Sequence, residues 1–251
     1  MNPAEPHPLM LALRRLSHHL SRDFLGGSRP LRLSWVINFQ KGGTALFVLL
    51  LMALYDNYSP AAWVYLALHG TYGLCWLLKH LAFPDKAWDV PVTLGGALMS
   101  FALVLGPYWV APFLLVSRLT SFEPSWPWLA LCIALHTLGV AIMMAADAQK
   151  FYTLKHRPGL ITEGMFKHVR HPNYLGEMMI YASYALLVGH WLPWLVLAWV
   201  WLALFAVNIH FKEISLSRYP EWPAYKARTG LLLPKLWGYV GGSREGRGSG
   251  V

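Results

Sequence analysis

Charged residues are scarce in this chain. Only 13% of its 251 residues are Asp, Glu, Lys or Arg, whereas 56% are hydrophobic, and soluble proteins average about 25% charged residues. This scarcity excludes an ordinary soluble domain. The composition is that of an integral membrane protein, in which about 20 consecutive apolar residues cross the bilayer as a helix.

Cysteine is nearly absent as well. Cys75 and Cys132 are the only two, and both fall inside apolar segments, which excludes a disulfide framework and a cysteine metal site. We expect no metal ligands. The N-terminal segment lacks an uninterrupted apolar core followed by a small-residue cleavage site, so we expect no cleaved signal peptide.

Apolar segments of membrane-spanning length make up most of the chain. Six run approximately over residues 44–55 (extendable back to Trp35), 61–83, 94–117, 126–146, 174–189 and 191–211. The first and fifth are the weakest, which gives a range of five to seven helices. The sequence therefore predicts an all-α, multi-span bundle of about six transmembrane helices.

Basic residues outnumber acidic ones, 21 to 12, and their placement indicates the orientation in the membrane. With the N-terminus in the cytosol, 20 of the 21 basic residues fall on the cytosolic side and only Arg118 falls outside, as expected for retained cytosolic loops. Both termini are therefore expected to be cytosolic. The net charge of +9 is then mainly a topology signal. It would also attract anionic lipid or a phosphorylated cofactor, and it does not indicate nucleic-acid binding.

Four regions differ in composition. Residues 1–40 form a basic leader, which is either an amphipathic interfacial helix or a disordered segment. Residues 41–139 hold the N-terminal transmembrane helices, expected on the substrate side. Residues 140–237 contain the polar clusters described below. The Gly/Ser/Arg-rich residues 238–251 are expected to be disordered.

A polar run, KHVRHPNYLGEMM, stands where an apolar segment begins. Pro172 favours the first turn of a helix, so Arg170 and His171 would lie beside its free backbone N–H groups and form an anion-binding corner. Asn173 and Glu177 would share one face, one turn apart. The alternative is an anchor at the lipid headgroups. Glu177 favours a site, because a carboxylate inside an apolar segment is costly unless it has a function or a buried partner.

Two more polar clusters lie on the same predicted side. ADAQK places Asp147, Gln149 and Lys150 after the fourth apolar segment. A surface ion pair between Asp147 and Lys150 is the simpler interpretation, and nucleotide binding is the functional one. Near the C-terminus, KEISLSRYPEWPAYKART contains Tyr225 and Arg228, and its simpler interpretation is a basic amphipathic segment at the membrane surface. Convergence of the three clusters indicates a shared site.

These motifs carry a resemblance to a known family. ADAQK, GLITEGMFKHVRHPNYLGE and KEISLSRYPEWPAYKARTGLLLP resemble the C-terminal domain of the steroid 5-alpha reductase family and its sterol reductase relatives, over roughly residues 140–237. Those relatives are multi-span enzymes that use NADPH to reduce an activated carbon–carbon double bond. The resemblance implies a cofactor cavity lined by Asp147, Gln149, Lys150, Arg170, His171, Asn173, Tyr174, Glu177, Tyr225 and Arg228.

A second family shares part of the pattern. RHPNYLG and EISLSRYPEWPAYKART are also similar to the isoprenylcysteine carboxyl methyltransferases, which bind S-adenosylmethionine. ADAQK and the glutamate after Gly176 look more like the reductases. A third class is a non-catalytic membrane protein on the same scaffold, since fold does not imply function.

A reductase also needs a donor for the charge that develops on a carbonyl oxygen. His69 and Tyr72, about one turn apart in ALHGTYGLCW, are the candidates. Tyr72 is otherwise an ordinary core or interfacial aromatic, whereas His69 lies near mid-span, where a polar group is costly. The early-span glutamate that animal steroid 5-alpha reductases place opposite a tyrosine is absent.

The sequence therefore predicts an integral membrane enzyme that reduces a lipophilic unsaturated substrate with NADPH. S-Adenosylmethionine is the alternative cofactor. The cofactor site is expected to face the cytosol, in the endoplasmic reticulum of a eukaryote or the inner membrane of a bacterium.

Overall fold

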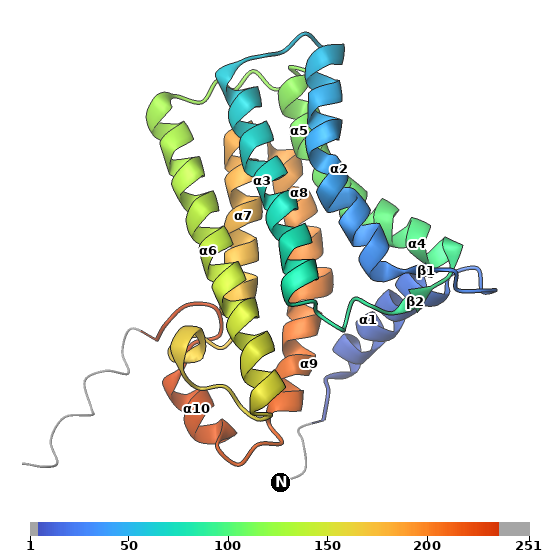
Figure 1. The fold of residues 1–251 in the computed structure, drawn as a ribbon, viewed down its shortest axis with the longest axis vertical. Coiled ribbons are helices and arrows are strands. Elements are labelled where there is room, and N and C mark those ends of the chain that lie inside the picture. The colour runs from blue at the N-terminus through green and yellow to red at the C-terminus, as the bar shows by residue number, and fades with distance from the viewer. Residues whose placement is uncertain (1–4, 236–251) are drawn as a thin grey trace, which may run out of the picture.

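The fold is a bundle of long helices (Figure 1). The structure is a computed structural model that describes residues 5–235. The tail expected to be disordered, 238–251, lies outside the described residues. Five helices are long and apolar enough to cross a membrane: Leu33–Leu54, Pro60–Ala82, Leu94–Val116, Trp126–His156 and Trp191–Leu216. This confirms the all-α, multi-span prediction.

The elements follow one another in a simple order, and two of the long helices contain π-helical turns. They are α1 (Pro8–His18), η1 (His19–Asp23), β1 (Leu31–Arg32), α2 (Leu33–Leu54), α3 (Pro60–Ala82), β2 (Pro91–Val92), α4 (Leu94–Ser100), η2 (Phe101–Leu105), η3 (Gly106–Trp109), α5 (Val110–Val116), α6 (Trp126–His156), η4 (Gly164–Phe166), α7 (Pro172–Val188), α8 (Trp191–Val200), η5 (Trp201–Phe205), α9 (Ala206–Leu216) and α10 (Trp222–Arg228).

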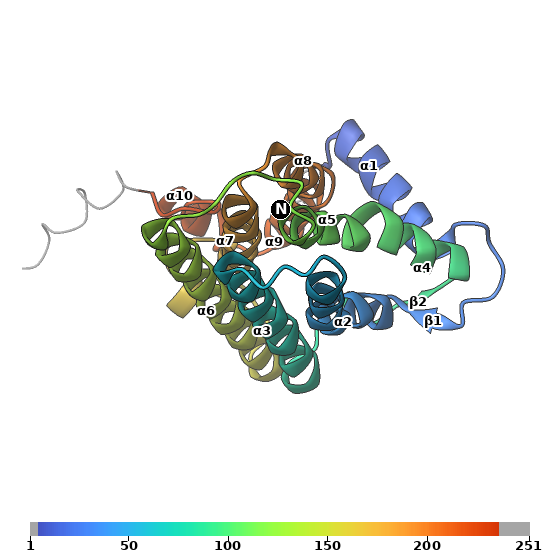
Figure 2. The ribbon, with the colours of Figure 1, turned by 90° about the horizontal axis from the view of Figure 1, so that it is seen from above.

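α7 is the central helix of the bundle. It is 17 residues long, about 25 Å at 1.5 Å per residue, and it contacts α3, α5, α6 and α8 (Figure 2). Pro172 stands in its first turn, as the sequence predicts, and Gly189 ends it in the left-handed conformation with φ 63°. With the five spanning helices, α7 completes the six predicted segments.

Glycine lets α6 and α7 approach closely. A Cβ atom on Gly176 would lie 2.6 Å from the carbonyl oxygen of Gly139, and one on Gly139 would lie 2.7 Å from the carbonyl oxygen of Gly176. Gly176 therefore brings a second helix close to the backbone of α7. The contact fixes the first turns of α7 against the middle of α6.

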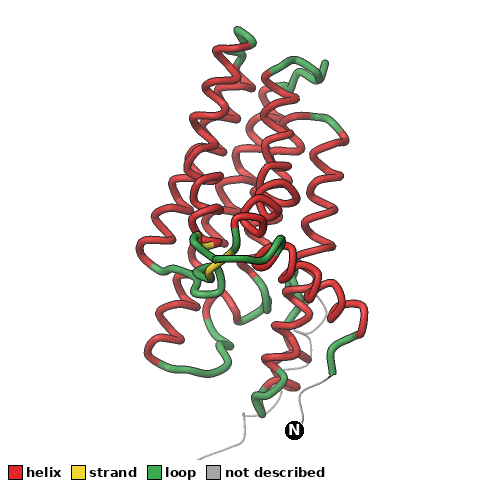
Figure 3. The backbone as a smooth tube through the Cα atoms, turned by 90° about the vertical axis from the view of Figure 1, so that its right-hand side faces the viewer, coloured by secondary structure: helices red, strands yellow, loops and turns green. Residues whose placement is uncertain are grey.

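The leader is part of the fold. Thr93 caps α4 and donates a hydrogen bond to the carbonyl oxygen of Phe24 at 2.8 Å, and a Cβ atom on Gly95 would lie 2.4 Å from that same oxygen. β1 pairs antiparallel with β2 (Figure 3). α2 begins at Leu33, so the last residues of the 1–40 region already belong to the first long helix. Across residues 5–235, one large buried cluster draws on both the N-terminal and C-terminal helices.

The two ends of the bundle differ in charge. α1, α10 and the start of α7 lie at one end, which we call the basic end (Figure 1). The loops that follow α2 and α5 lie at the other. There Arg118 donates a hydrogen bond to the carbonyl oxygen of Asp56 at 3.2 Å. Lys41, one of the basic residues assigned to the cytosolic side, is the ninth residue of α2 and is buried.

Candidate functional site

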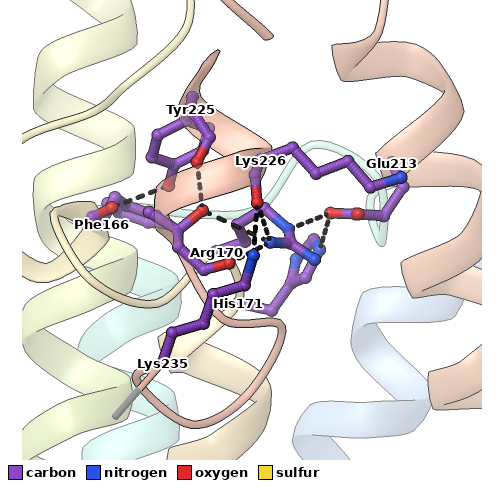
Figure 4. Close-up of polar contacts among 8 residues, drawn as sticks. Phe166, Arg170, His171, Glu213, Tyr225, Lys226 and Lys235 are labelled. Carbon is purple, nitrogen blue, oxygen red and sulfur yellow. Dashed lines mark hydrogen bonds and ion pairs between the residues drawn. The ribbon is translucent and has the colours of Figure 1, made fainter. Parts of the chain in front are cut away.

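The predicted site residues and their partners form three groups, between the basic end and the middle of the bundle. The first group is the clasp, made by Arg170, His171, Glu213 and Thr229 (Figure 4). Arg170 Nε donates to Glu213 Oε1 at 3.0 Å, and its Nη1 donates to the Thr229 carbonyl oxygen at 2.6 Å. His171 Nε2 lies 2.9 Å from the same Glu213 oxygen. The clasp thus ties the start of α7 to α9 and to the C-terminal segment.

Backbone hydrogen bonds reinforce the clasp. The amides of Arg170 and His171 donate to the carbonyl oxygens of Gly230 and Leu231, at 2.9 and 3.1 Å. The Tyr225 hydroxyl donates to the carbonyl oxygen of Phe166 at 2.7 Å (Figure 4). The side chains of Arg170, His171 and Tyr225 thus contact the protein itself, and anion binding at this helix start stays a prediction.

The Gln149 side chain also forms hydrogen bonds to the protein backbone. Its Oε1 accepts from the Met165 amide at 2.8 Å, and its Nε2 donates to the Glu163 carbonyl oxygen at 3.0 Å. It therefore fixes the loop between α6 and α7. Arg228 is exposed at the rim, with its guanidinium carbon 5.8 Å from the Tyr225 ring centre.

The clasp is expected to weaken in acid. Burial lowers the pKa of His171 below its ordinary value of 6.5, although the hydrogen bond to Glu213 acts in the opposite direction. Lys212 and Arg170 add to the lowering. A depressed histidine pKa means that the clasp's contribution is complete above about pH 6.5 and is lost as the pH falls through the folded-state pKa.

We therefore expect the thermal midpoint of the wild type to fall between about pH 7.5 and about pH 5.5. His171→Gln, which cannot titrate, should show a smaller fall. Thermal unfolding of both proteins at the two pH values measures this. An equal fall in both would assign the pH dependence to other groups.

The second group is the charge cluster, made by Lys79, Asp147, Glu177 and Lys212. Lys79 of α3 and Asp147 of α6 form a direct ion pair in which the two side chains are 7% and 9% exposed. Lys150 pairs with Asp85 at 3.6 Å, nearer the surface. The simple pairing of Asp147 with Lys150 is therefore wrong, because each residue finds its partner on or after α3.

Glu177 lies one turn inside α7 and is half-buried. Its side chain makes no hydrogen bond and no direct ion pair with any residue from 5 to 235. Lys79, Asp147, Lys41 and Lys212 act on it electrostatically without direct contact. Lys212 Nζ lies 4.6 Å above the ring of Tyr174. Asn173 is partly exposed in the first turn of α7. Together these groups present both ammonium and carboxylate partners to a ligand.

A shallow cleft opens at the basic end beside this cluster, between α2 and α3. Trp76, Lys79 and Asp85 belong to its walls, so Lys79 is the member of the charge cluster that lines this cleft. The lining is Ser34, Ile37, Asn38, Trp76, Lys79, His80, Asp85 and Trp88.

The third group lies deeper in the bundle than the charge cluster. It is made by Lys41, His69, Tyr72, Tyr181 and the rings around them, and we call it the aromatic chamber. Lys41 donates a short hydrogen bond to the Tyr181 hydroxyl. Its Nζ lies within about 6 Å of four ring centres, close enough for cation–π attraction: 4.8 Å for Tyr72 and Tyr181, 5.3 Å for Tyr108 and 5.4 Å for Trp76. The buried ammonium group of Lys41 is thus surrounded by aromatic rings and hydrogen-bonded to the phenol of Tyr181.

His69 and Tyr72, the predicted donors, lie in the chamber and are both 0% exposed. His69 Nδ1 lies 3.0 Å from the Tyr65 hydroxyl, and its ring stacks on Tyr184 at 4.3 Å. His69 Nε2 has no hydrogen-bond partner among the described residues, and the Tyr72 hydroxyl, which lies near that of Tyr181, makes no hydrogen bond of regular geometry there. Buried polar atoms are normally paired, so two orphans in one chamber indicate a place for a polar ligand atom.

Sequence reasoning missed several members of the three groups. In the sequence, Lys41 and Lys79 serve only as topology signals, Glu213 belongs to a basic amphipathic segment at the membrane surface, and Tyr181 carries no prediction. A usable signal existed for Lys41, because a lysine inside an apolar helix is costly and by default functional. Glu213 and Tyr181 offered none, since their partners are distant in the sequence.

Two uncharacterized proteins of Schizosaccharomyces pombe are similar to parts of this chain. One is 43% identical over 49 residues, which is 20% of this chain and 18% of the relative. The other is 30% identical over 95 residues, which is 36% of this chain and 28% of the relative. The similarity therefore spans less than a third of either relative.

A larger match covers more than half of the chain. Residues 96–229 match a family described as a protein of unknown function, DUF1295. The matched range contains the clasp and also Asp147 and Glu177, whereas Lys41, His69 and Tyr72 precede it. The chain belongs to the DUF1295 family.

Proposed function

We propose that this protein is a membrane-embedded, NADPH-dependent reductase of a carbon–carbon double bond in a lipophilic substrate. The observation that carries the proposal is the pair of orphaned buried atoms, His69 Nε2 and the Tyr72 hydroxyl, beside the Lys41–Tyr181 pair. The resemblance of residues 140–237 to the steroid 5-alpha reductase family supplies the reaction class.

The chamber suits the oxygen of an enone substrate. If His69 Nδ1 accepts from Tyr65, its Nε2 carries a hydrogen, and it can donate together with the Tyr72 hydroxyl to one carbonyl oxygen. These donors stabilise the negative charge that the oxygen gains when hydride adds to the β-carbon. The surrounding rings exclude water, which strengthens both hydrogen bonds.

Tyr181 is the group best placed to supply the proton. In the reaction the α-carbon takes a proton, and the donor is left with a negative oxygen. The ammonium group of Lys41, hydrogen-bonded to the Tyr181 hydroxyl, stabilises that phenolate and can return a proton to it. Solvent restores the proton through the cleft at the basic end.

The charge cluster fits a phosphorylated nucleotide by the chemistry of its donors. NADPH would supply the hydride. Lys212 of the cluster and Lys150, which lies nearer the surface beside Asp85, offer ammonium groups to phosphate, and Asp147 and Glu177 offer carboxylates to ribose hydroxyls. Arg170 and His171 would support this site through the clasp, because their hydrogen bonds already hold Glu213 and Thr229.

A methyltransferase that uses S-adenosylmethionine is the alternative. Glu177, which has no direct partner in the described part of the chain, would suit a cationic ligand. A methyl transfer needs an oriented nucleophile and no acid, however, so it leaves the Lys41–Tyr181 pair without a purpose. A non-catalytic protein would leave the orphaned atoms unexplained as well.

Ligand binding tests the proposal without a known substrate. The purified protein in detergent is titrated with NADPH, NADH and S-adenosylmethionine while its thermal midpoint is followed, since a ligand of the folded state raises apparent stability by mass action. We expect stabilisation by NADPH. Stabilisation by S-adenosylmethionine alone would make the chain a methyltransferase, and no stabilisation by any of the three would favour a non-catalytic protein.

Two variants locate the bound cofactor. Glu177→Gln and Asn173→Ala are each expected to weaken NADPH binding by about 10- to 100-fold, as loss of a hydrogen bond to a charged group does, and to leave folding intact. Glu163→Gln, at an exposed ion pair with Arg157 at the same end, is the matched control. Normal affinity in both test variants would place the cofactor elsewhere.

A further inference from the structure

The outer side of α1 is an apolar surface at the basic end, and the proposed reaction does not use it. α1 buries none of its residues against the protein. Leu9 and Leu16 are 58% and 54% exposed, and Ala12 between them is exposed too. Positions 9, 12 and 16 share one helical face. This face, which we call the leucine face, is apolar and has no partner within residues 5–235.

The opposite side of α1 is docked on α9. The guanidinium carbon of Arg14 lies 4.2 Å from the ring centre of Phe211, and the His7 amide donates to His210 Nε2 at 3.3 Å. These contacts fix the leucine face outward, away from the bundle. Phe211 lies five residues before the end of the candidate span Trp191–Leu216, about 7–8 Å along the helix. α1 is therefore level with the boundary of the apolar zone.

The apolar surface continues beyond α1. η1 packs on α4, and Leu25, which follows η1, is 80% exposed. Leu94 and Leu98 at the start of α4 are each 65% exposed. They belong to a helix apolar enough to span the membrane. α1 and α4 lie on the same side of the bundle (Figure 1), so their exposed leucines extend one apolar region from α1 to a spanning helix.

The charge on α1 has one sign. Arg14 and Arg15 are exposed, the helix contains no Asp or Glu, and Arg22 follows in η1. An amphipathic helix with leucines on one face and arginines beside it inserts the leucines below the headgroups and attracts anionic ones. Each arginine near an anionic surface contributes about 1 kcal/mol, which is about fivefold in a binding constant.

We propose that α1 is an anionic-lipid-binding element: its leucine face lies among the acyl chains at the basic end, and Arg15 beside that face contacts lipid phosphate. The inference does not depend on the reductase proposal. It carries a consequence for the site, because α1 rests on the turn of α9 that leads directly to Lys212 and Glu213. Lipid that holds α1 in place would steady the segment that carries both side chains.

A fluorescent label tests the position of the leucine face. Ala12→Cys, in a background with Cys75 and Cys132 replaced by Ala, is labelled with an environment-sensitive dye. The full chain is then placed in nanodiscs of phosphatidylcholine alone or mixed with phosphatidylglycerol. Ser28→Cys, in the exposed loop before β1, is the control. We expect blue-shifted emission and quenching by spin-labelled acyl chains at position 12 only, stronger with phosphatidylglycerol.

Charge variants separate the two parts of the proposal. Arg15→Gln should reduce the effect of phosphatidylglycerol by about fivefold, whereas Arg29→Gln, whose residue pairs with Asp23, should leave it unchanged. Equal burial of the dye at position 12 in nanodiscs with and without phosphatidylglycerol would overturn the claim that α1 prefers anionic lipid. A water-exposed label in both would overturn the proposal, as would cross-linking of two copies through position 12, which would make a second chain the partner.

Discussion

Asp147→Ala is expected to destabilise the protein by about 3–5 kcal/mol, the usual result of leaving one charge of a buried ion pair without its partner. The charge left behind is Lys79, whose side chain is only 7% exposed. Neither Glu177 nor any other described carboxylate makes a direct ion pair with it. The thermal midpoint and the chemical unfolding curve of the solubilised protein measure this loss.

Two controls make this result interpretable. Asp85→Ala removes the partner of Lys150, but that pair is about one-third exposed and 3.6 Å long, so the change should cost at most about 1 kcal/mol. The double variant Lys79→Met/Asp147→Leu replaces the pair by apolar side chains and should recover most of the loss. If Asp147→Ala cost no more than Asp85→Ala, the ion pair would not be a stabilising contact.

The double variant also separates stability from binding. If Asp147 or Lys79 serves only the fold, the recovered protein should still be stabilised by NADPH. If either side chain contacts the nucleotide, the recovered protein should fold and lose that stabilisation. A single variant could not distinguish these cases, because its unfolding would abolish binding in both.

Turnover is expected to depend most strongly on the chamber. Tyr72→Phe and Tyr181→Phe should each lower the rate of double-bond reduction by about 10²- to 10³-fold, the range found when a general acid or an oxyanion donor is removed. His69→Phe should lower it as well. NADPH binding should be preserved, since none of these side chains belongs to the charge cluster. Single-turnover oxidation of bound NADPH by an enone is the measurement.

Tyr65→Phe is the matched control for those variants. Its hydroxyl bonds to His69 Nδ1 at 3.0 Å, so the change keeps the ring and removes only a hydrogen bond behind the proposed donor. A modest loss of rate is expected. Unchanged turnover in Tyr72→Phe and His69→Phe would remove both residues as donors, and unchanged turnover in Tyr181→Phe would remove it as the proton source.

Much of the fold could be predicted because each span is a local property of the sequence. The six apolar segments all coincide with helices, and Pro172 marks the start of α7 as expected. The differences lie at element ends: the first span is predicted over residues 44–55, extendable back to Trp35, whereas α2 begins at Leu33. Polar residues at the start of α2, such as Gln40 and Lys41, are buried by neighbouring helices, so local hydropathy underestimates the helix.

The candidate site could be predicted only in part. The polar clusters gather towards the basic end, and His69 and Tyr72 lie together deeper in the bundle, while their roles stay predictions. The partners of individual residues could not be predicted. Arg170 and His171 bind Glu213, and Asp147 binds Lys79, across separations of more than 40 residues. No periodicity links such positions.

By itself, the sequence determined that this chain is an all-helical membrane protein with polar chemistry at one end, because hydropathy and charge act on each segment separately. Only the tertiary structure decided which of those polar groups are bound to one another and which are left without a partner. Whether a buried charge is paired or orphaned depends on the helix that faces it, and that is settled by packing.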